Sequence, residues 1–334
     1  MDTALRPMST SQVLDRTFSL YRNNFFLFAG IALITPALKL VAVLAQLAIF
    51  GPLFVPNQGK FDPQLFQQLM VKSVIAMGVG VIVYVIGTAF ASSATIYAVS
   101  MVHLGKTTTI QESYAKIRSI VWRILGLLIR VFFLALWPFI AGYTLILVAG
   151  LAIVALRRNA GASVAILGGI IGLVAFATIV GGLVWMIIAF CRYALAVPAC
   201  TLERLPAKIS VIRSKFLTDG CKGSILLIYI LTGLMTAALT YVLQLPALFA
   251  SKIMFFNASA HMGMGALVWI YVADFLGGAI AGPIATIAIA LMYYDQRVRK
   301  EAFDLQLMME AVGVAQPVQA QAQAAGNGPV PSIG

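Results

Sequence analysis

Six long apolar segments, separated by short polar ones, run along this chain and predict helices that cross a membrane. Each is longer than the roughly 20 residues that a helix needs to span the hydrocarbon core of a bilayer. Their apolar residues form continuous runs, unlike the short alternating segments of a membrane β-barrel. The sequence therefore predicts an all-α, polytopic helical bundle with transmembrane helices at 25–50, 71–102, 120–156, 164–192, 225–248 and 265–294.

An amphipathic segment precedes the first, the third and the fifth of these spans. Apolar residues recur on one face of each segment at helical spacing, and charged residues occupy the other faces. Two of the segments begin with a capping-box pattern, formed by Ser9 with Gln12 and by Thr109 with Glu112. We expect all three to be short elbow helices in the membrane interface, near residues 10–24, 109–119 and 206–219.

The last span leads directly into a charged helix, the exit helix, which we place at 295–311. Residues 1–8 are a polar leader, and 314–334 form an Ala/Gln/Pro tail that we expect to be disordered. One membrane domain, 9–306, lies between them. The exit helix carries three pairs of opposite charge four residues apart, a spacing that stabilises helices: Asp295 with Arg299, Arg297 with Glu301, and Lys300 with Asp304.

The elbow segments also suggest an internal repeat. Arg22, Arg118 and Arg213 each follow an apolar residue and have a second apolar residue four positions before them. Each elbow segment precedes two spans, so the chain divides into three units of one elbow and one helical hairpin. Any interfacial helix that leads into a span can show the same pattern, so a true threefold repeat and a chance likeness both stay open.

Composition and charge agree with a membrane protein. The chain is 61% hydrophobic and 10% charged, with a mean hydropathy of +0.96, whereas soluble domains contain about a quarter charged residues. The net charge of +12 raises the question of nucleic-acid binding. Sixteen of the 23 basic residues, however, fall on the side of the elbows and the exit helix. This bias predicts that both termini are cytoplasmic, and we expect no nucleic-acid partner.

Residues for catalysis or metal binding are scarce. The three cysteines show no C-x-x-C spacing, and the two histidines are far apart. We find no nucleophile–base pair, phosphate-binding loop or cluster of metal ligands. We therefore expect no enzymatic activity, no metal and no cofactor.

Charged residues inside spans are the usual indication of function in a membrane protein. Lys39, Arg130 and Asp274 are such residues here. Counted from the span ends, Lys39 and Asp274 both lie in the outer half of the membrane, where they can pair across the bundle. Arg130 lies nearer the midplane and has no evident carboxylate partner. The three residues predict either a polar pathway or lipid site, or a structural ion pair with a snorkelling arginine.

The chain resembles the glycerophosphodiester phosphodiesterase membrane-domain family and related bacterial integral-membrane proteins. The resemblance rests on DRTFSLYRNNF at 15–25, on Pro198, Glu203, Arg213, Ser214 and Leu217, and above all on LMYYDQRVRKEAFDL at 291–305. The family pattern favours Gly where this chain has Ala302. Some relatives join this membrane domain to a soluble phosphodiesterase barrel. The chain lacks the His-Arg pair and the Glu-x-Asp metal pair of that barrel, so the resemblance implies the membrane part only.

These observations lead to two functional hypotheses. The first is a non-enzymatic protein of the bacterial cytoplasmic (inner) membrane, a lipid-associated scaffold or accessory factor with membrane lipids and a cytoplasmic protein as partners. The alternative is a transporter or lipid-flipping protein with a polar site near Lys39, Arg130 and Asp274. The contact surface of a scaffold would be formed by Arg213, Asp295, Arg297, Arg299, Lys300, Glu301 and Asp304.

Overall fold

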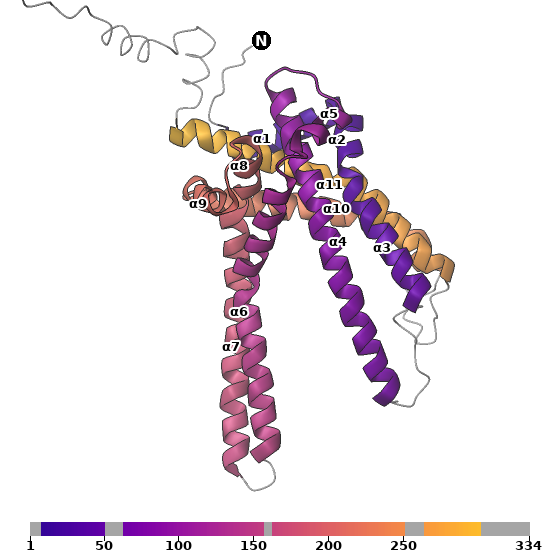
Figure 1. Ribbon diagram of the computed structural model, residues 1–334, viewed down its shortest axis with the longest axis vertical. Coiled ribbons are helices and arrows are strands. Elements are labelled where there is room, and N and C mark those ends of the chain that lie inside the picture. Colours follow the sequence, from indigo (N-terminus) through magenta and orange to yellow (C-terminus); the bar gives the residue numbers. More distant parts are fainter. Residues whose placement is uncertain (1–7, 51–62, 157–161, 251–263, 302–334) are drawn as a thin grey trace, which may run out of the picture.

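The computed structural model describes residues 8–50, 63–156, 162–250 and 264–301, and every regular element in these ranges is an α-helix (Figure 1). Six segments are long and apolar enough to cross a membrane, which confirms the predicted all-α membrane bundle. In chain order the helices are α1 (Thr10–Asn23), α2 (Phe25–Ala32), α3 (Ile34–Phe50), α4 (Pro63–His103), α5 (Ile110–Ile117), α6 (Val121–Leu156), α7 (Ala162–Tyr193), α8 (Ala196–Leu202), α9 (Ala207–Thr218), α10 (Lys222–Ala250) and α11 (Met264–Glu301).

The spans differ from the predicted segments at a few points. The first span is broken at Leu33, close to Pro36, into α2 and α3. Helix α4 begins at Pro63, eight residues before the predicted start of the second span at 71. Pro63 stands at the first helical position that proline favours. Helix α8 was not predicted, because it is short and lies in a segment without helical periodicity.

The last span and the start of the exit helix are one continuous helix, α11. The remainder of the predicted exit helix, the turn at 157–161 and the C-terminal tail lie outside the described residues. In an apolar stretch of 18 residues of α11, 61% of the residues are buried, against 12–22% in the corresponding stretches of the other spanning helices. Helix α11 crosses the molecule obliquely and packs against α10, α3, α4 and α1, so it is the central helix of the bundle (Figure 1).

The elbow helices α1, α5 and α9 gather with α8 at one end of the molecule, which we call the elbow end (Figure 1). The main hydrophobic core lies there, around Phe28, Leu127, Ile228 and the fully buried Tyr293. Away from the elbow end, α6 and α7 run side by side as a hairpin that diverges from α3 and α4 (Figure 1). The bundle is therefore tightly packed at one end and open at the other.

Local capping explains where the elbow helices begin and where their neighbours end. Ser9 and Gln12 form the complete capping box on α1, as predicted. Thr109 caps α5 by accepting from the N–H of Glu112, but the predicted second half of the box is not formed, because the Glu112 carboxylate accepts from Thr108 Oγ1 at 3.2 Å. Gly105 ends α4 with φ +75°. The backbone N–H of Gly105 donates to the carbonyl of Val102, and that of Lys106 donates to the carbonyl of Met101, as at many helix ends with a glycine. Gly220 has φ +83° after α9, a conformation that glycine adopts without strain.

The three elbows share a burial pattern that repeats when their N-caps are aligned. The fourth, eighth, eleventh and twelfth residues after each N-cap are buried in all three elbows. The N-caps are Ser9, Thr109 and Pro206. Arg22, Arg118 and Arg213 stand at three different distances from these caps, so the arginine spacing does not mark equivalent positions. What repeats is the packing of an elbow on the bundle.

Aromatic side chains donate hydrogen bonds to backbone carbonyls close to prolines in the spanning helices, and in one case to the carbonyl that the proline leaves free. A helical proline cannot donate to the carbonyl one turn before it, and an unsatisfied carbonyl is costly in a membrane. Before Pro138 of α6 that carbonyl belongs to Leu134, and Trp185 Nε1 of α7 donates to it at 3.1 Å. Three more prolines have an aromatic donor to a carbonyl shortly before them: Trp269 to Leu243 before Pro246, Tyr21 to Ile280 before Pro283, and Tyr114 to Ile31 before Pro36.

Replacing Trp185 by phenylalanine should therefore lower the free energy of unfolding by about 1 kcal/mol, the typical contribution of one hydrogen bond. The loss should nearly vanish in the P138A background, because a backbone N–H then reaches Leu134 again. Unfolding in mixed micelles with rising SDS, followed by circular dichroism, measures both. An equal loss in the two backgrounds would instead assign the effect to the packing of Trp185 on Trp137.

Candidate functional site

The ion pair predicted between two intramembrane charges is present. Lys39 Nζ on α3 lies 2.6 Å from Asp274 Oδ2 on α11. The side chains are 51% and 37% exposed, so the pair lines an open space and not the packed core. An isolated charge inside a membrane is costly, and pairing with an opposite charge reduces this cost.

Two glycines allow the helices around this pair to approach one another closely. A Cβ on Gly278 of α11 would lie 3.3 Å from Cβ of Pro36, and a Cβ on Gly87 of α4 would lie 3.1 Å from Cα of Thr35. A larger residue at either position would push its helix away from α3. Gly278 lies one turn after Asp274, and Pro36 lies one turn before Lys39, so this contact sets the distance between the two charges.

A cavity of about 370 Å³ adjoins the ion pair and is bordered by α3, α4, α10 and α11. Thr88 and Ser92 donate to backbone carbonyls of their own helix, but Thr35 Oγ1 is buried and has no partner among the described residues. The Thr35 hydroxyl is therefore a buried, unsatisfied polar group one helical turn from Lys39. The hydroxyl groups that line the cavity belong to Thr35, Tyr84, Thr88, Ser92, Thr95, Thr236 and Thr286.

A second cavity, of about 570 Å³, lies against α10 and α11. It is lined by further polar side chains, including Thr240 and Gln244. Thr236 and Asp274 line both cavities. Asp274 thus stands where the two spaces meet.

Arg130 does not join this site. Its side chain is exposed on α6, and it has no ion pair among the described residues. It lines neither of the two cavities at Asp274. The structure therefore brings together two of the three predicted intramembrane charges and leaves Arg130 apart.

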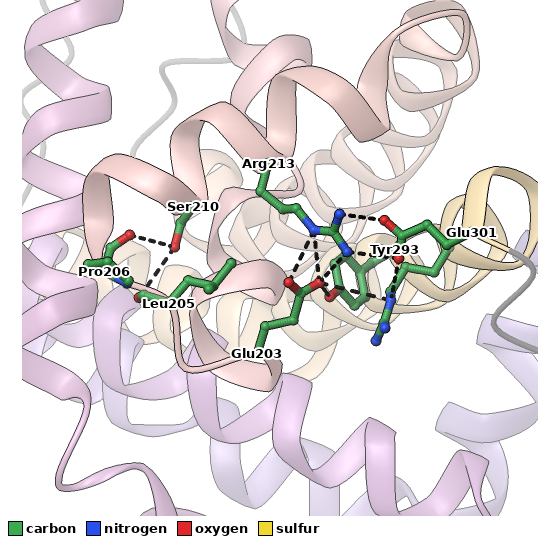
Figure 2. Close-up of polar contacts among 8 residues, drawn as sticks. Glu203, Leu205, Pro206, Ser210, Arg213, Tyr293 and Glu301 are labelled. Atoms are coloured by element: carbon green, nitrogen blue, oxygen red, sulfur yellow. Dashed lines mark hydrogen bonds and ion pairs between the residues drawn. The ribbon is translucent and has the colours of Figure 1, made fainter. Parts of the chain in front are cut away.

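A second polar cluster, the arginine cluster, ties α9 to α11 at the elbow end. Arg213 on α9 donates to Glu203, which follows α8, at 3.1 Å and to Glu301 on α11 at 2.8 Å. Figure 2 shows its guanidinium group between these two carboxylates. The buried Tyr293 donates its hydroxyl to Glu203 Oε1, and Arg297 Nε lies 3.1 Å from Glu301 Oε2. Each charge in the arginine cluster therefore has an opposite partner.

The cluster also stabilises the charge of Arg213. Burial by itself would lower the pKa of Arg213, but its hydrogen bonds to Glu203 and Glu301 outweigh burial and raise the pKa above the ordinary value. The side chain is 26% exposed. Arg213 thus stays protonated at every pH at which the protein is folded.

The other charges of α11 hold the N-terminal segment and α9. Asp295 is buried and accepts from Arg299 Nε at 2.8 Å and from the backbone N–H of Met8 at 2.6 Å. Lys300 donates to the carbonyls of Phe216 and Asp219, both at 2.7 Å. A cation at these carbonyls caps the C-terminal end of α9.

The structure changes the interpretation of the predicted contact surface. The pairs Asp295–Arg299 and Arg297–Glu301 are present as predicted, and Asp304 lies outside the described residues. Six of the seven predicted residues bind one another, Glu203 or the backbone. Sequence reasoning did not place Glu203 or Tyr293 among the site residues, although both belong to the patterns that carry the family resemblance. The scarcity of acids, 11 in 334 residues, is the signal that could have identified Glu203, because few carboxylates exist for so many arginines.

The remaining reactive groups do not form a further site in the described ranges. No group of three His, Cys, Asp or Glu side chains that could hold a metal ion occurs there. Cys191, Cys200 and Cys221 are free and buried, and burial raises the pKa of the Cys221 thiol. Comparison with protein-family models, with curated proteins and with solved structures finds no match. The resemblance of the sequence to the phosphodiesterase membrane domain therefore stays a prediction.

Proposed function

We propose that the protein is a transporter whose substrate site is the cavity beside Lys39 and Asp274. The observation that carries this proposal is an ion pair inside the membrane that lines a cavity of about 370 Å³ together with seven hydroxyl-bearing side chains from the residues that the structure describes. Cavities of this size are typical of small-molecule sites. A structural ion pair would need no such space, and would be better protected if the helices closed around it.

The chemistry of the site favours a small anionic or zwitterionic substrate. Lys39 can exchange Asp274 for a carboxylate or phosphate of the substrate, because its flexible ammonium group binds either as a point charge. The unsatisfied hydroxyl of Thr35 lies one helical turn from it and would reach a ligand after a rotation of its side chain. The helix break at Leu33 and Pro283 of α11 adjoin the same cavity. Interrupted helices around a central site are common in transporters, where they allow one part of the bundle to move against another.

The topology proposed from the charges is compatible with this role. With the elbow end in the cytoplasm, as the bias of basic residues suggests, both termini are cytoplasmic. We place the protein in the bacterial cytoplasmic membrane, as the resemblance of its sequence implies. The tightly packed elbow end would close the cytoplasmic side of the bundle in this conformation.

A scaffold is the second candidate, and a different surface supports it. The charges that we expected at its contact surface are engaged within the molecule. Helix α9 instead exposes an apolar stripe formed by Ile209, Ile212 and Phe216, which are 49%, 64% and 53% exposed. A stripe of this kind suits the membrane interface or a partner helix. It explains nothing about the polar cavity, and we therefore place the scaffold second.

Cysteine accessibility tests the transport proposal without knowledge of the substrate. In proteoliposomes, T236C should react with a membrane-impermeant, charged thiol reagent, because Thr236 lines both cavities. Ile82→Cys is the control: Ile82 is 61% exposed on α4 and lines neither cavity, so in a bilayer it faces lipid and should not react. The three native cysteines are buried and give a low background. Equal, low reactivity of both variants would mean a dry cavity and would contradict a polar pathway.

A further inference from the structure

A groove between α4, α5 and α6 is separate from the cavity at the ion pair, and Arg118 is the only charged residue in its lining within the described ranges. Its volume is about 560 Å³, and most of its lining is apolar, with Ile86, Phe90 and Leu125 among the wall residues. Gln111 and Arg118 lie at its elbow end. One face of α4 lines this groove and another lines the polar cavity, so α4 is the wall between them.

Arg118 brings an unused positive charge to the groove. Its side chain is exposed, and no carboxylate lies within ion-pair distance of it among the described residues. Arg213, by contrast, is held by two carboxylates. An arginine fork binds the oxygens of a phosphate group bidentately, with hydrogen bonds strengthened by both charges. Arg118 therefore provides what an anionic headgroup needs.

The residues beyond Arg118 suit the apolar part of the same ligand. Trp122 lies at the start of α6, four residues after Arg118 across the turn between α5 and α6, and is 79% exposed. Tryptophan favours the level of the headgroups and the first carbons of the acyl chains. The hydroxyl of Tyr114 is engaged with the carbonyl of Ile31, so its ring serves as a wall of the groove. Charge, amphipathic ring and apolar walls thus follow one another from the elbow end inward, in the order of a phospholipid.

We propose that this groove binds one anionic phospholipid from the leaflet at the elbow end. The phosphate lies on Arg118, the glycerol region beside Gln111 and Trp122, and an acyl chain runs between α4 and α6 past Phe90 and Ile86. The site uses neither Lys39 nor Asp274. Its test is therefore independent of the proposed transport function.

Native mass spectrometry of the detergent-purified full chain tests the proposal with two lipids of identical acyl chains, dioleoylphosphatidylglycerol and dioleoylphosphatidylcholine. The wild type should retain one phosphatidylglycerol in preference to phosphatidylcholine. Arg118→Gln should reduce that preference about fivefold, the effect of one basic residue at an anionic membrane surface. Trp122→Ala should weaken the retention of both lipids, because it removes apolar contact without changing charge.

Matched variants separate this site from general effects. Arg22→Gln removes another exposed elbow arginine that has no ion pair in the described part of the chain, and Phe176→Ala removes an aromatic side chain that is 69% exposed on α7. Both should behave like the wild type. Size-exclusion profiles and melting temperatures establish that each variant is folded, and Arg118→Lys, which keeps the charge, should give an intermediate preference. Unchanged selectivity in Arg118→Gln would overturn the proposal. Binding of glycerol 1-phosphate alone as strongly as the lipid would also overturn it and assign the site to a soluble phosphoester.

Discussion

Replacing Arg213 by methionine should lower the free energy of unfolding by about 3 kcal/mol, the largest single effect that we expect in this protein. Removing one partner of a buried ion pair leaves the other charge without compensation, which costs several kcal/mol. Here two carboxylates, Glu203 and Glu301, would lose their central partner, although Arg297 stays beside both. We expect the loss in the free energy of unfolding to lie at the lower end of this cost, because the Arg213 side chain is 26% exposed.

The measurement is the unfolding transition in mixed micelles of SDS and a mild detergent. Lys208→Met is the matched control, since Lys208 is an exposed cation on the same helix without an ion pair among the described residues. Arg213→Lys should fall between the two, because an ammonium group cannot donate bidentately to Glu203 while also reaching Glu301. The double variant R213M/E203Q should lose less than the sum of its single variants. Strict additivity would contradict a coupled arginine cluster.

The number and positions of the spanning helices could be predicted because membrane helices carry a strong local signal. A run of about 20 apolar residues has few alternatives in a bilayer, and the caps at Ser9 and Thr109 lie within three residues of their partners. Such signals do not depend on the rest of the fold. Helix α8 gave no signal, because it is held by tertiary contacts with α9 and α4 and not by its own pattern.

The candidate site could be predicted only where chemistry left one solution. Lys39 and Asp274 lie 235 residues apart, but two opposite charges at the same depth of an apolar bundle have a strong reason to meet. For the charged side chains of α11, several bonding partners were possible. Their sequence spacing predicted the bonds within the helix, yet the bonds from Lys300 to the end of α9 and from Met8 to Asp295 depend on the path of other segments. Sequence therefore suggested an exposed surface where the fold has internal connections.

Removing either charge of the intramembrane pair should be costly, and removing both should be much less so. Lys39→Met leaves Asp274 unpaired, and Asp274→Asn leaves Lys39 unpaired. A lone charge in a spanning helix costs about 2.5 kcal/mol or more at the membrane centre. We expect about 2 kcal/mol for each single variant, because both side chains border a cavity that water can enter. The double variant K39M/D274N should recover most of this loss in the same unfolding measurement.

The charge-swapped variant K39D/D274K separates a structural role of this pair from a role in binding. It keeps an opposite pair in the same place, so a purely structural pair would retain both stability and function. A transporter that exchanges Asp274 for an anionic substrate would keep its stability but lose uptake, because the cation would now project from α11 and not from α3. If K39M/D274N regained the stability of the wild type and its physiological activity were unchanged, this result would contradict the transport proposal. The two charges would then only neutralise each other inside the bundle, and the function of the protein would have to be sought at the elbow end.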